Sequence, residues 1–141
     1  MWPHDTAIAV LGLARAEQPA AAARHLRALL DAATGSASGP ELYGGDDGPT
    51  PYPPSCRPQA CAAAVGPAMV TALLGFEVDA PAGRLALRPM APSPVGAYRV
   101  RGLRIGTGVL DVDVDADGRP EVVTLPPGFT FTSGGRSVGC R

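Results

Sequence analysis

Apolar residues recur every three or four positions in three stretches of the N-terminal half, which is the period of an amphipathic α-helix. The first stretch begins at Pro3 and the second at Pro19, and proline suits a first helical turn because its missing N–H has no partner there. The third runs from about Pro58 to Leu74 and is closed by Gly75. The apolar positions are Ala7, Ile8, Val10, Leu11 and Ala14; then Ala23, Leu26, Leu29, Leu30 and Ala33; then Cys61, Ala64, Val65, Ala68, Met69, Ala72 and Leu73.

The connections between these predicted helices restrict their arrangement. Only Glu17 and Gln18 separate the first two helices, so we expect an antiparallel helical hairpin. Gly35 is expected to end the second helix. Pro67 lies inside the third helix and removes one backbone hydrogen bond, which predicts a kink without a break.

After Gly75 the pattern changes to alternation of apolar and polar residues, which predicts half-buried antiparallel strands. Residues 122–125 and 129–132 are expected to add one or two more strands. The alternating apolar positions are Leu85 and Leu87, then Tyr98, Val100, Leu103 and Ile105, then Leu110, Val112 and Val114.

A long loop between the second and third helices draws attention to one acidic residue. The segment from Pro40 to Ala60 contains Glu41 and has prolines at positions 49, 51, 53 and 54, which restrict the backbone. A connection of this length inside a small domain usually has a function. We therefore interpret Glu41 as the candidate chemical centre.

Composition excludes several classes of partner. The chain has 141 residues, 45% of them hydrophobic, and a net charge of −1 from 12 basic and 13 acidic residues, so it lacks the field that attracts nucleic acid or an anionic membrane. No apolar run reaches the ~18 residues that span a bilayer. The apolar run from Ala7 to Ala16 lacks a preceding Lys or Arg, which disfavours a signal peptide. Three cysteines without a CxxC pair favour a reducing compartment, and we expect a cytoplasmic protein.

The acidic run from Asp111 to Gly118 imitates a calcium-binding loop. Counting from Asp113, the twelfth position is Thr124 where such a loop requires a bidentate glutamate, and the intervening valines indicate a strand with a charged face in water. The arginines at positions 99, 101 and 104 are interpreted in the same way, as a solvated strand face. We therefore expect no metal ion and no cofactor.

Several motifs together resemble one enzyme family. They are Trp2-Pro3-His4-Asp5-Thr6-Ala7, Pro40-Glu41-Leu42-Tyr43-Gly44-Gly45, Pro51-Tyr52-Pro53 and Ser55-Cys56-Arg57-Pro58-Gln59-Ala60. In this order they resemble the C-terminal end of bacterial amylo-α-1,6-glucosidase-like proteins, the glucosidase part of glycogen debranching enzymes, over roughly residues 2–115. The resemblance implies a mainly α fold: the last three helices of an (α/α)6 barrel of the six-hairpin glycosidase type, followed by a small antiparallel β segment.

The resemblance also implies roles for individual residues. Inverting hydrolysis needs an acid and a base with carboxyl groups ~6.5–9.5 Å apart, and Glu41 matches the family's general base. The residues that match the sugar subsite are His4, Asp5, Tyr43, Tyr52 and Gln59. The family's general acid precedes the Trp-Pro-His-Asp motif and so lies outside this chain. Cys61 stands where the family usually has a tryptophan, which removes a large stacking surface.

Without the resemblance, the same residues have simpler interpretations. Asp5 is then a first-turn charge favoured by the helix dipole, and Glu41 is a loop carboxylate in water. With it, we expect residues 1–76 to contain the barrel helices and a catalytic loop at 35–57, and residues 77–141 to form the β segment and tail. Met1 is then a start codon read inside a longer frame.

The function expected from the resemblance is that of a fragment. The fragment belongs to an inverting glycoside hydrolase acting on α-glucosidic, amylo-α-1,6-type linkages of an oligo- or polysaccharide, and it is inactive alone. The alternatives are a non-catalytic carbohydrate-binding remnant, or a subunit that needs a separately encoded N-terminal barrel half.

Overall fold

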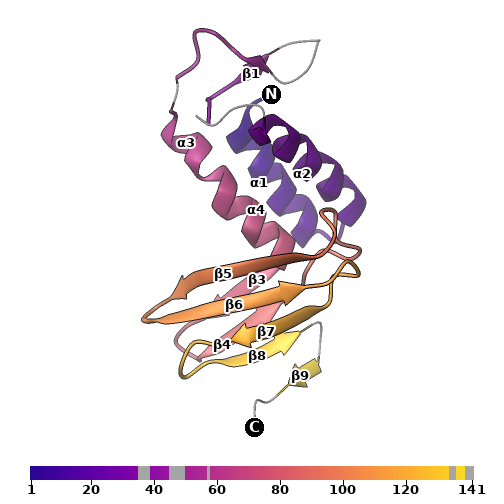
Figure 1. Ribbon diagram of the computed structural model, residues 1–141, viewed down its shortest axis with the longest axis vertical. Helices are drawn as coiled ribbons and strands as arrows, with labels where there is room; N and C mark the ends of the chain where they lie inside the picture. The colour runs from indigo at the N-terminus through magenta and orange to yellow at the C-terminus, as the bar shows by residue number, and fades with distance from the viewer. Residues whose placement is uncertain (35–38, 45–49, 57, 134–135, 139–141) are drawn as a thin grey trace. The chain divides into compact units, whose positions relative to one another are not determined.

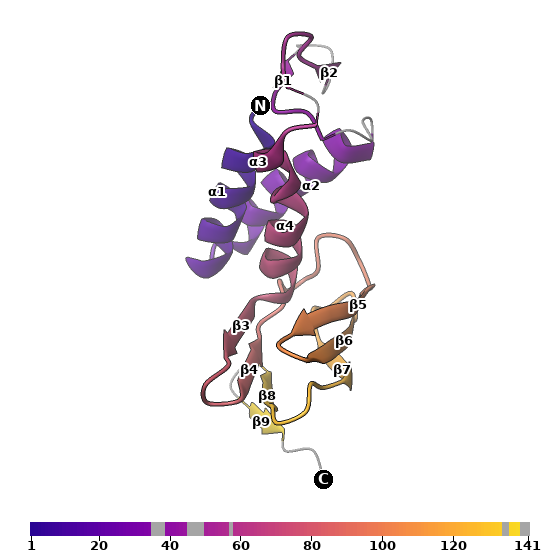
Figure 2. The same ribbon diagram turned by 90° about the vertical axis from the view of Figure 1, so that its left-hand side faces the viewer.

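A computed structural model describes residues 1–34, 39–44, 50–56, 58–133 and 136–138. The chain divides into two compact units, Met1–Ala72 and Leu73–Arg141, and each is described by itself. Figures 1 and 2 show helices and a small hairpin in the first unit, and strands in the second. The sequence-based division at residues 76 and 77 falls close to this boundary.

Two helices pack side by side in the first unit, as the apolar period predicts. Helix α1 spans Pro3–Arg15 and α2 spans Pro19–Thr34. The turn between them closes when the N–H groups of Ala16 and Gln18 donate to carbonyls in the last turn of α1. The buried residues are Pro3, Ala7 and Val10 of α1 and Ala22, Leu26, Leu29 and Ala32 of α2. The buried alanines of α2 thus lie one position before the predicted Ala23 and Ala33.

The predicted third helix is broken, and the expected kink at Pro67 is wrong. Helix α3 covers Ala60–Ala63 and α4 covers Val65–Leu74, with Ala64 between them. Pro67 therefore lies in the first turn of α4, where its missing N–H costs no helical hydrogen bond. Cys61 of α3 is exposed and does not face the core.

The second unit contains two sheets. Strands β3 (Phe76–Asp79), β4 (Arg84–Leu87), β8 (Thr130–Ser133) and β9 (Arg136–Val138) form one sheet in the order β3-β4-β8-β9. Strands β5 (Tyr98–Ile105), β6 (Gly108–Val114) and β7 (Pro120–Thr124) form an antiparallel second sheet. β4 and β8 run parallel, which corrects the expectation of antiparallel strands alone.

The predicted alternation produces the core of this unit. Leu110, Val112 and Val114 of β6 are buried while Asp111 and Asp113 between them are half-buried, which confirms the predicted strand with a charged face. Leu85 and Leu87 of β4 are also fully buried. Most of the buried core of the β unit thus forms from the alternate residues that the sequence pattern selects, and Leu74 and Met90 add to it.

The expected fold class is wrong. The chain is not mainly α and does not end a helical barrel: in its described residues the helices stop at Leu74, and the rest forms strands β3 to β9. The reason is that the period-two pattern governs nearly all of the chain after Gly75, whereas the family resemblance rests on short motifs before Ala60. Among the described residues, no helix has both the length and the apolar character needed to cross a bilayer.

Candidate functional site

The described residues of the predicted loop around Glu41 include a two-stranded hairpin that pairs with the start of the chain, and residues 45–49 and 57 lie outside the described residues. Strand β1 (Tyr43–Gly44) pairs antiparallel with β2 (Thr50–Pro51). On its other side, Tyr43 exchanges backbone hydrogen bonds with Met1: the Tyr43 N–H donates to the Met1 carbonyl at 2.9 Å, and the Met1 amino group donates to the Tyr43 carbonyl. Residues 1, 43 and 51 therefore lie next to one another across three short segments.

Tyr43 fixes this hairpin to the helices. Its side chain is 5% exposed, and its hydroxyl donates to the carbonyl of Ala32 in α2 at 3.2 Å. The hydroxyl that the family resemblance assigned to a sugar subsite thus has a partner inside the helical unit. Burial of the ring and this hydrogen bond both stabilise the position of the hairpin.

The backbone of Glu41 is fixed while its carboxylate has a weak partner. The Glu41 N–H donates to the Cys56 carbonyl at 3.1 Å, and the Cys56 N–H approaches the Glu41 Oε2 atom at 3.5 Å. The Gln59 N–H reaches the Gly39 carbonyl at 3.4 Å, so the base of the loop is held on both sides of Glu41. Glu41 as a residue is half-buried, the contact of its carboxylate with Cys56 is exposed, and among the described residues it forms no ion pair. It retains acceptor sites for water or a ligand.

The other predicted site residues come from segments that meet at this end of the helical unit. His4 and Asp5 lie in the first turn of α1, with His4 Nδ1 and Asp5 Oδ1 3.5 Å apart, and both side chains reach solvent. Gln59 is the N-cap of α3, which lies beside α1, and its side chain makes no cap hydrogen bond. Tyr52 is 47% exposed, which leaves its ring available to a ligand.

Trp2 is an exposed aromatic residue of this region that was not among the predicted site residues. Trp2 precedes α1 in an extended conformation and is 49% exposed, although tryptophan is usually largely buried. A strand of two residues gives no periodic signal, so the pairing of Met1 with Tyr43 is invisible in the sequence. The unusual position of a tryptophan before a helix-starting proline was the available signal.

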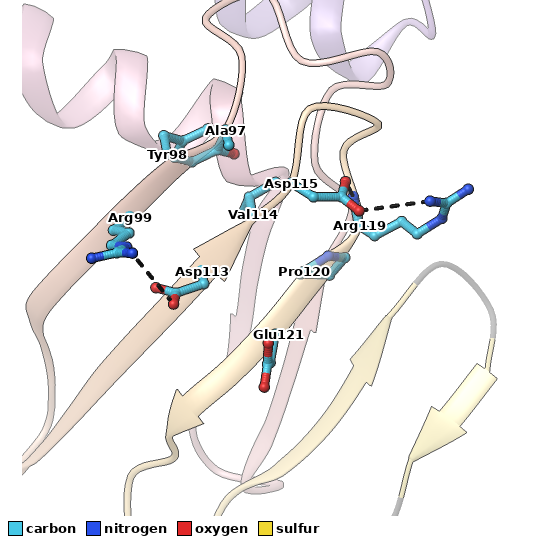
Figure 3. A pocket seen from close by; sticks show the side chains of 9 residues that line it. All are labelled: Ala97, Tyr98, Arg99, Asp113, Val114, Asp115, Arg119, Pro120 and Glu121. Atoms are coloured by element: carbon cyan, nitrogen blue, oxygen red, sulfur yellow. Dashed lines mark hydrogen bonds and ion pairs between the residues drawn. The ribbon is translucent and has the colours of Figure 1, made fainter.

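A hollow lies on the sheet of β5, β6 and β7. It is an open pocket of about 530 Å³, lined by Ala97, Tyr98, Arg99, Asp113, Val114, Asp115, Arg119, Pro120 and Glu121 (Figure 3). Arg99 lies 3.9 Å from Asp113, and Arg119 lies 3.6 Å from Asp115. Because these arginines are already paired with carboxylates, the pocket offers little net attraction to an ionic ligand of either sign.

Hydrogen bonds on this sheet lower the pKa of one aspartate. The Gly102 N–H donates to Asp111 Oδ1 at 2.8 Å, and the Thr124 hydroxyl donates to Asp111 Oδ2 at 2.9 Å. The Gly102 hydrogen bond, followed by that of Thr124, lowers the pKa of Asp111 because both favour the ionised form. The Asp111 carboxylate thus forms hydrogen bonds within the sheet. The described residues contain no group of three side chains suited to a metal ion.

Comparison with protein-family models finds no match to this chain, and comparison with curated proteins likewise finds none. The assignment of function therefore depends on the geometry around Glu41 and on the sequence motifs.

Proposed function

We propose that residues 1–72 bind an α-glucoside and carry Glu41 as the general base of an inverting glycoside hydrolase of the amylo-α-1,6-glucosidase type. The observation that supports this proposal most is the difference between the main chain and the carboxylate of Glu41. Its main chain is bonded to Cys56, while among the described residues its carboxylate has one weak contact, of 3.5 Å. A base needs this combination, because it must keep its position and still accept a proton from water.

In the proposed reaction, Glu41 takes a proton from a water molecule as that water attacks the anomeric carbon. The bond from this carbon to the leaving oxygen breaks, and a general acid donates a proton to that oxygen. We assign the acid to a segment or chain outside these 141 residues. Hydrolysis of an ordinary glycoside by this chain alone is then not expected.

Polar groups on the segments that are hydrogen-bonded around Glu41 suit the hydroxyl groups of a sugar. His4, Asp5 and Gln59 belong to the segments that meet at this end of the unit, and all three reach solvent at least in part. Tyr52 offers an exposed ring and hydroxyl. We do not include Tyr43 among the ligand contacts, because its hydroxyl donates to Ala32.

A non-catalytic carbohydrate-binding role is the second candidate. The exposure of Trp2 and Tyr52, at 49% and 47%, favours it, because exposed rings bind the apolar faces of sugars whether or not a reaction follows. The third alternative is a subunit whose acid comes from a separately encoded chain. We place the protein in the cytoplasm in each case, and the exposed free thiols of Cys56 and Cys61 support a reducing compartment.

The role of Glu41 as general base can be tested with a substrate whose leaving group needs no general acid. Fluoride leaves α-glucosyl fluoride without protonation, so water activated by Glu41 should yield β-glucose, fluoride and a proton from the full chain alone. We expect Glu41→Gln to lower fluoride release about 100-fold or more. Glu121→Gln, which alters an exposed carboxylate of the β unit, is the matched control and should leave the rate unchanged. Equal rates for wild type and Glu41→Gln would refute the assignment of Glu41.

A further inference from the structure

The hairpin and the start of α1 together form a small three-stranded ladder with two faces. Tyr43 and Met1 exchange both backbone hydrogen bonds, which is the pattern of directly opposed residues in antiparallel strands. Tyr43 is also opposite Pro51. Continuing both registers by one residue puts Leu42 between Trp2 and Tyr52, and the hydrogen bond from the Tyr52 N–H to the Leu42 carbonyl at 2.9 Å agrees with this.

Alternation assigns the side chains to the two faces. Tyr43 points into the helical unit and is buried, so its neighbours in each strand point outward. Trp2 and Tyr52 are both about half exposed, and Leu42 between them is half-buried. We call these three side chains the aromatic row.

Gly44 extends this outer face and leaves room for Tyr52. A Cβ atom at Gly44 would lie 3.4 Å from Cδ2 of the Tyr52 ring, so the edge of the ring lies beside the glycine. A larger residue at Gly44 would lift the ring away from the ladder. The glycine therefore helps to hold the ring of Tyr52 against the sheet.

We propose that the aromatic row is a stacking platform for a chain of at least two α-linked glucose residues; the identity of the sugar rests on the proposed function. Adjacent strands are 4.7–4.9 Å apart, so the backbones of Trp2 and Tyr52 are separated by about 9.5 Å. One pyranose ring cannot cover both aromatic rings at that separation, whereas two linked rings can.

The surroundings of the aromatic row favour a carbohydrate over a purely apolar ligand. His4 and Asp5 follow Trp2 in the first turn of α1, and both side chains reach solvent. A ligand that extends from the aromatic row toward the start of α1 therefore meets polar groups as well as the rings and the leucine. A pyranose has the matching chemistry, with C–H groups on its faces and hydroxyl groups around its edge.

Trp2 is the single tryptophan of the chain, so its fluorescence reports binding directly. We expect maltotriose to shift or quench the emission of the full chain with saturation, and glucose to require about tenfold higher concentration or more. Tyr52→Ala and Gly44→Val should each weaken maltotriose binding at least about tenfold, with circular dichroism confirming the fold. Ile8→Ala, an exposed residue of α1 outside the row, is the matched control and should bind as wild type does.

The outcomes separate this inference from the function of Glu41. If Glu41→Gln binds maltotriose with saturation but no longer releases fluoride, both proposals are supported. If the wild type binds maltotriose but releases no fluoride, the stacking platform is supported and the role of Glu41 as general base is refuted. Fluoride release that depends on Glu41, with no change in Trp2 emission on adding maltotriose, would overturn the platform and leave the base intact. Equal binding of glucose and maltotriose, or full binding by Tyr52→Ala, would also overturn it.

Discussion

The N–H of Gly102 donates to the carboxylate of Asp111 at 2.8 Å, and this contact holds an irregular part of the β5–β6–β7 sheet. The pairing of β5 with β6 shifts between Val100 and Leu103, so Gly102 lies in a bulge. The pairing of β6 with β7 shifts beside Asp111, whose second oxygen accepts from Thr124. One carboxylate of β6 thus connects the irregular pairings on both sides of that strand, with β5 and with β7, where ladder hydrogen bonds are interrupted.

Asp111 should make the stability of the β unit depend on acid pH. Its hydrogen bonds lower the pKa of the folded state below the unfolded value of about 3.9. The resulting stabilisation is fully present above the unfolded pKa and is lost as the pH falls through the folded pKa. We expect Asp111→Asn to lower the urea midpoint at neutral pH and to differ less from wild type in acid.

Urea titrations at a series of pH values measure this effect. Thr124→Val removes only the second donor, so it should produce a smaller change in the same direction. A constant difference between Asp111→Asn and wild type at every pH would show that the carboxylate charge contributes nothing.

Gly102 should accept a small side chain at a moderate cost. Its φ is +71°, a conformation that L side chains rarely adopt, but a Cβ atom added there would meet open space. The cost therefore comes from the backbone alone, and we expect Gly102→Ala to lower the free energy of unfolding by about 1–2 kcal/mol. Thermal or urea unfolding checks this value. Gly12 of α1, also in open space but in helical backbone, is the matched control, and Gly12→Ala should raise stability by about 1 kcal/mol.

Gly75 should tolerate substitution much less well than Gly102. It has φ +54°, and an added Cβ would lie 1.9 Å from the Arg88 carbonyl oxygen, so backbone atoms must move. Gly96 has φ +73° but open space around it. We expect Gly75→Ala to prevent cooperative unfolding of the β unit in circular dichroism while Gly96→Ala remains folded. Similar stabilities of the two variants would contradict the predicted clash.

Tyr98 should make the protein sensitive to alkaline pH. Its hydroxyl donates to the Leu73 carbonyl at 2.9 Å, and burial raises the pKa of Tyr98 above its ordinary value. A raised folded pKa gives stability that is present below the unfolded value of about 10 and is lost as the pH rises through the folded pKa. Tyr98→Phe should cost about 0.5–1.5 kcal/mol at neutral pH and should weaken the alkaline loss. Unfolding curves at neutral pH and above the unfolded value measure both effects.

Tyr43→Phe tests whether Tyr43 is structural. Loss of the hydroxyl bond to Ala32 should lower stability by about 1 kcal/mol. Because the ring is buried, we expect the affinity for maltotriose to stay unchanged in the Trp2 fluorescence titration. A selective loss of sugar affinity at unchanged stability would return Tyr43 to the ligand contacts.

The sequence pattern predicted the helices and strands in which the spacing of apolar residues is regular over several helical turns or several strand residues. Pro3 and Pro19 mark the starts of α1 and α2 correctly, and the alternation from Leu110 to Val114 selects the buried face of β6. In these elements the local period and the burial in the unit agree.

The remaining features depend on contacts that no local period encodes. Ala64 interrupts the third helix although alanine favours helices, and the resemblance to a barrel family gave the wrong fold class. At the candidate site, Glu41 could be singled out from its loop and motif. The pairing of Met1 with Tyr43, which turns Tyr43 inward and Trp2 outward, joins segments far apart in the chain and could not be predicted.

The parallel pairing of β4 with β8 also affects the order in which the chain can fold during synthesis. Strand β4 (Arg84–Leu87) can pair with β8 (Thr130–Ser133) only after β8 has been synthesised, and β5, β6 and β7 are all synthesised in between. The local turns of β5–β6–β7 can close earlier, because contacts between nearby residues form faster than distant ones. One edge of β4 therefore stays unpaired on the ribosome until residue 133 has emerged, and during that interval it is open to pairing with another nascent chain.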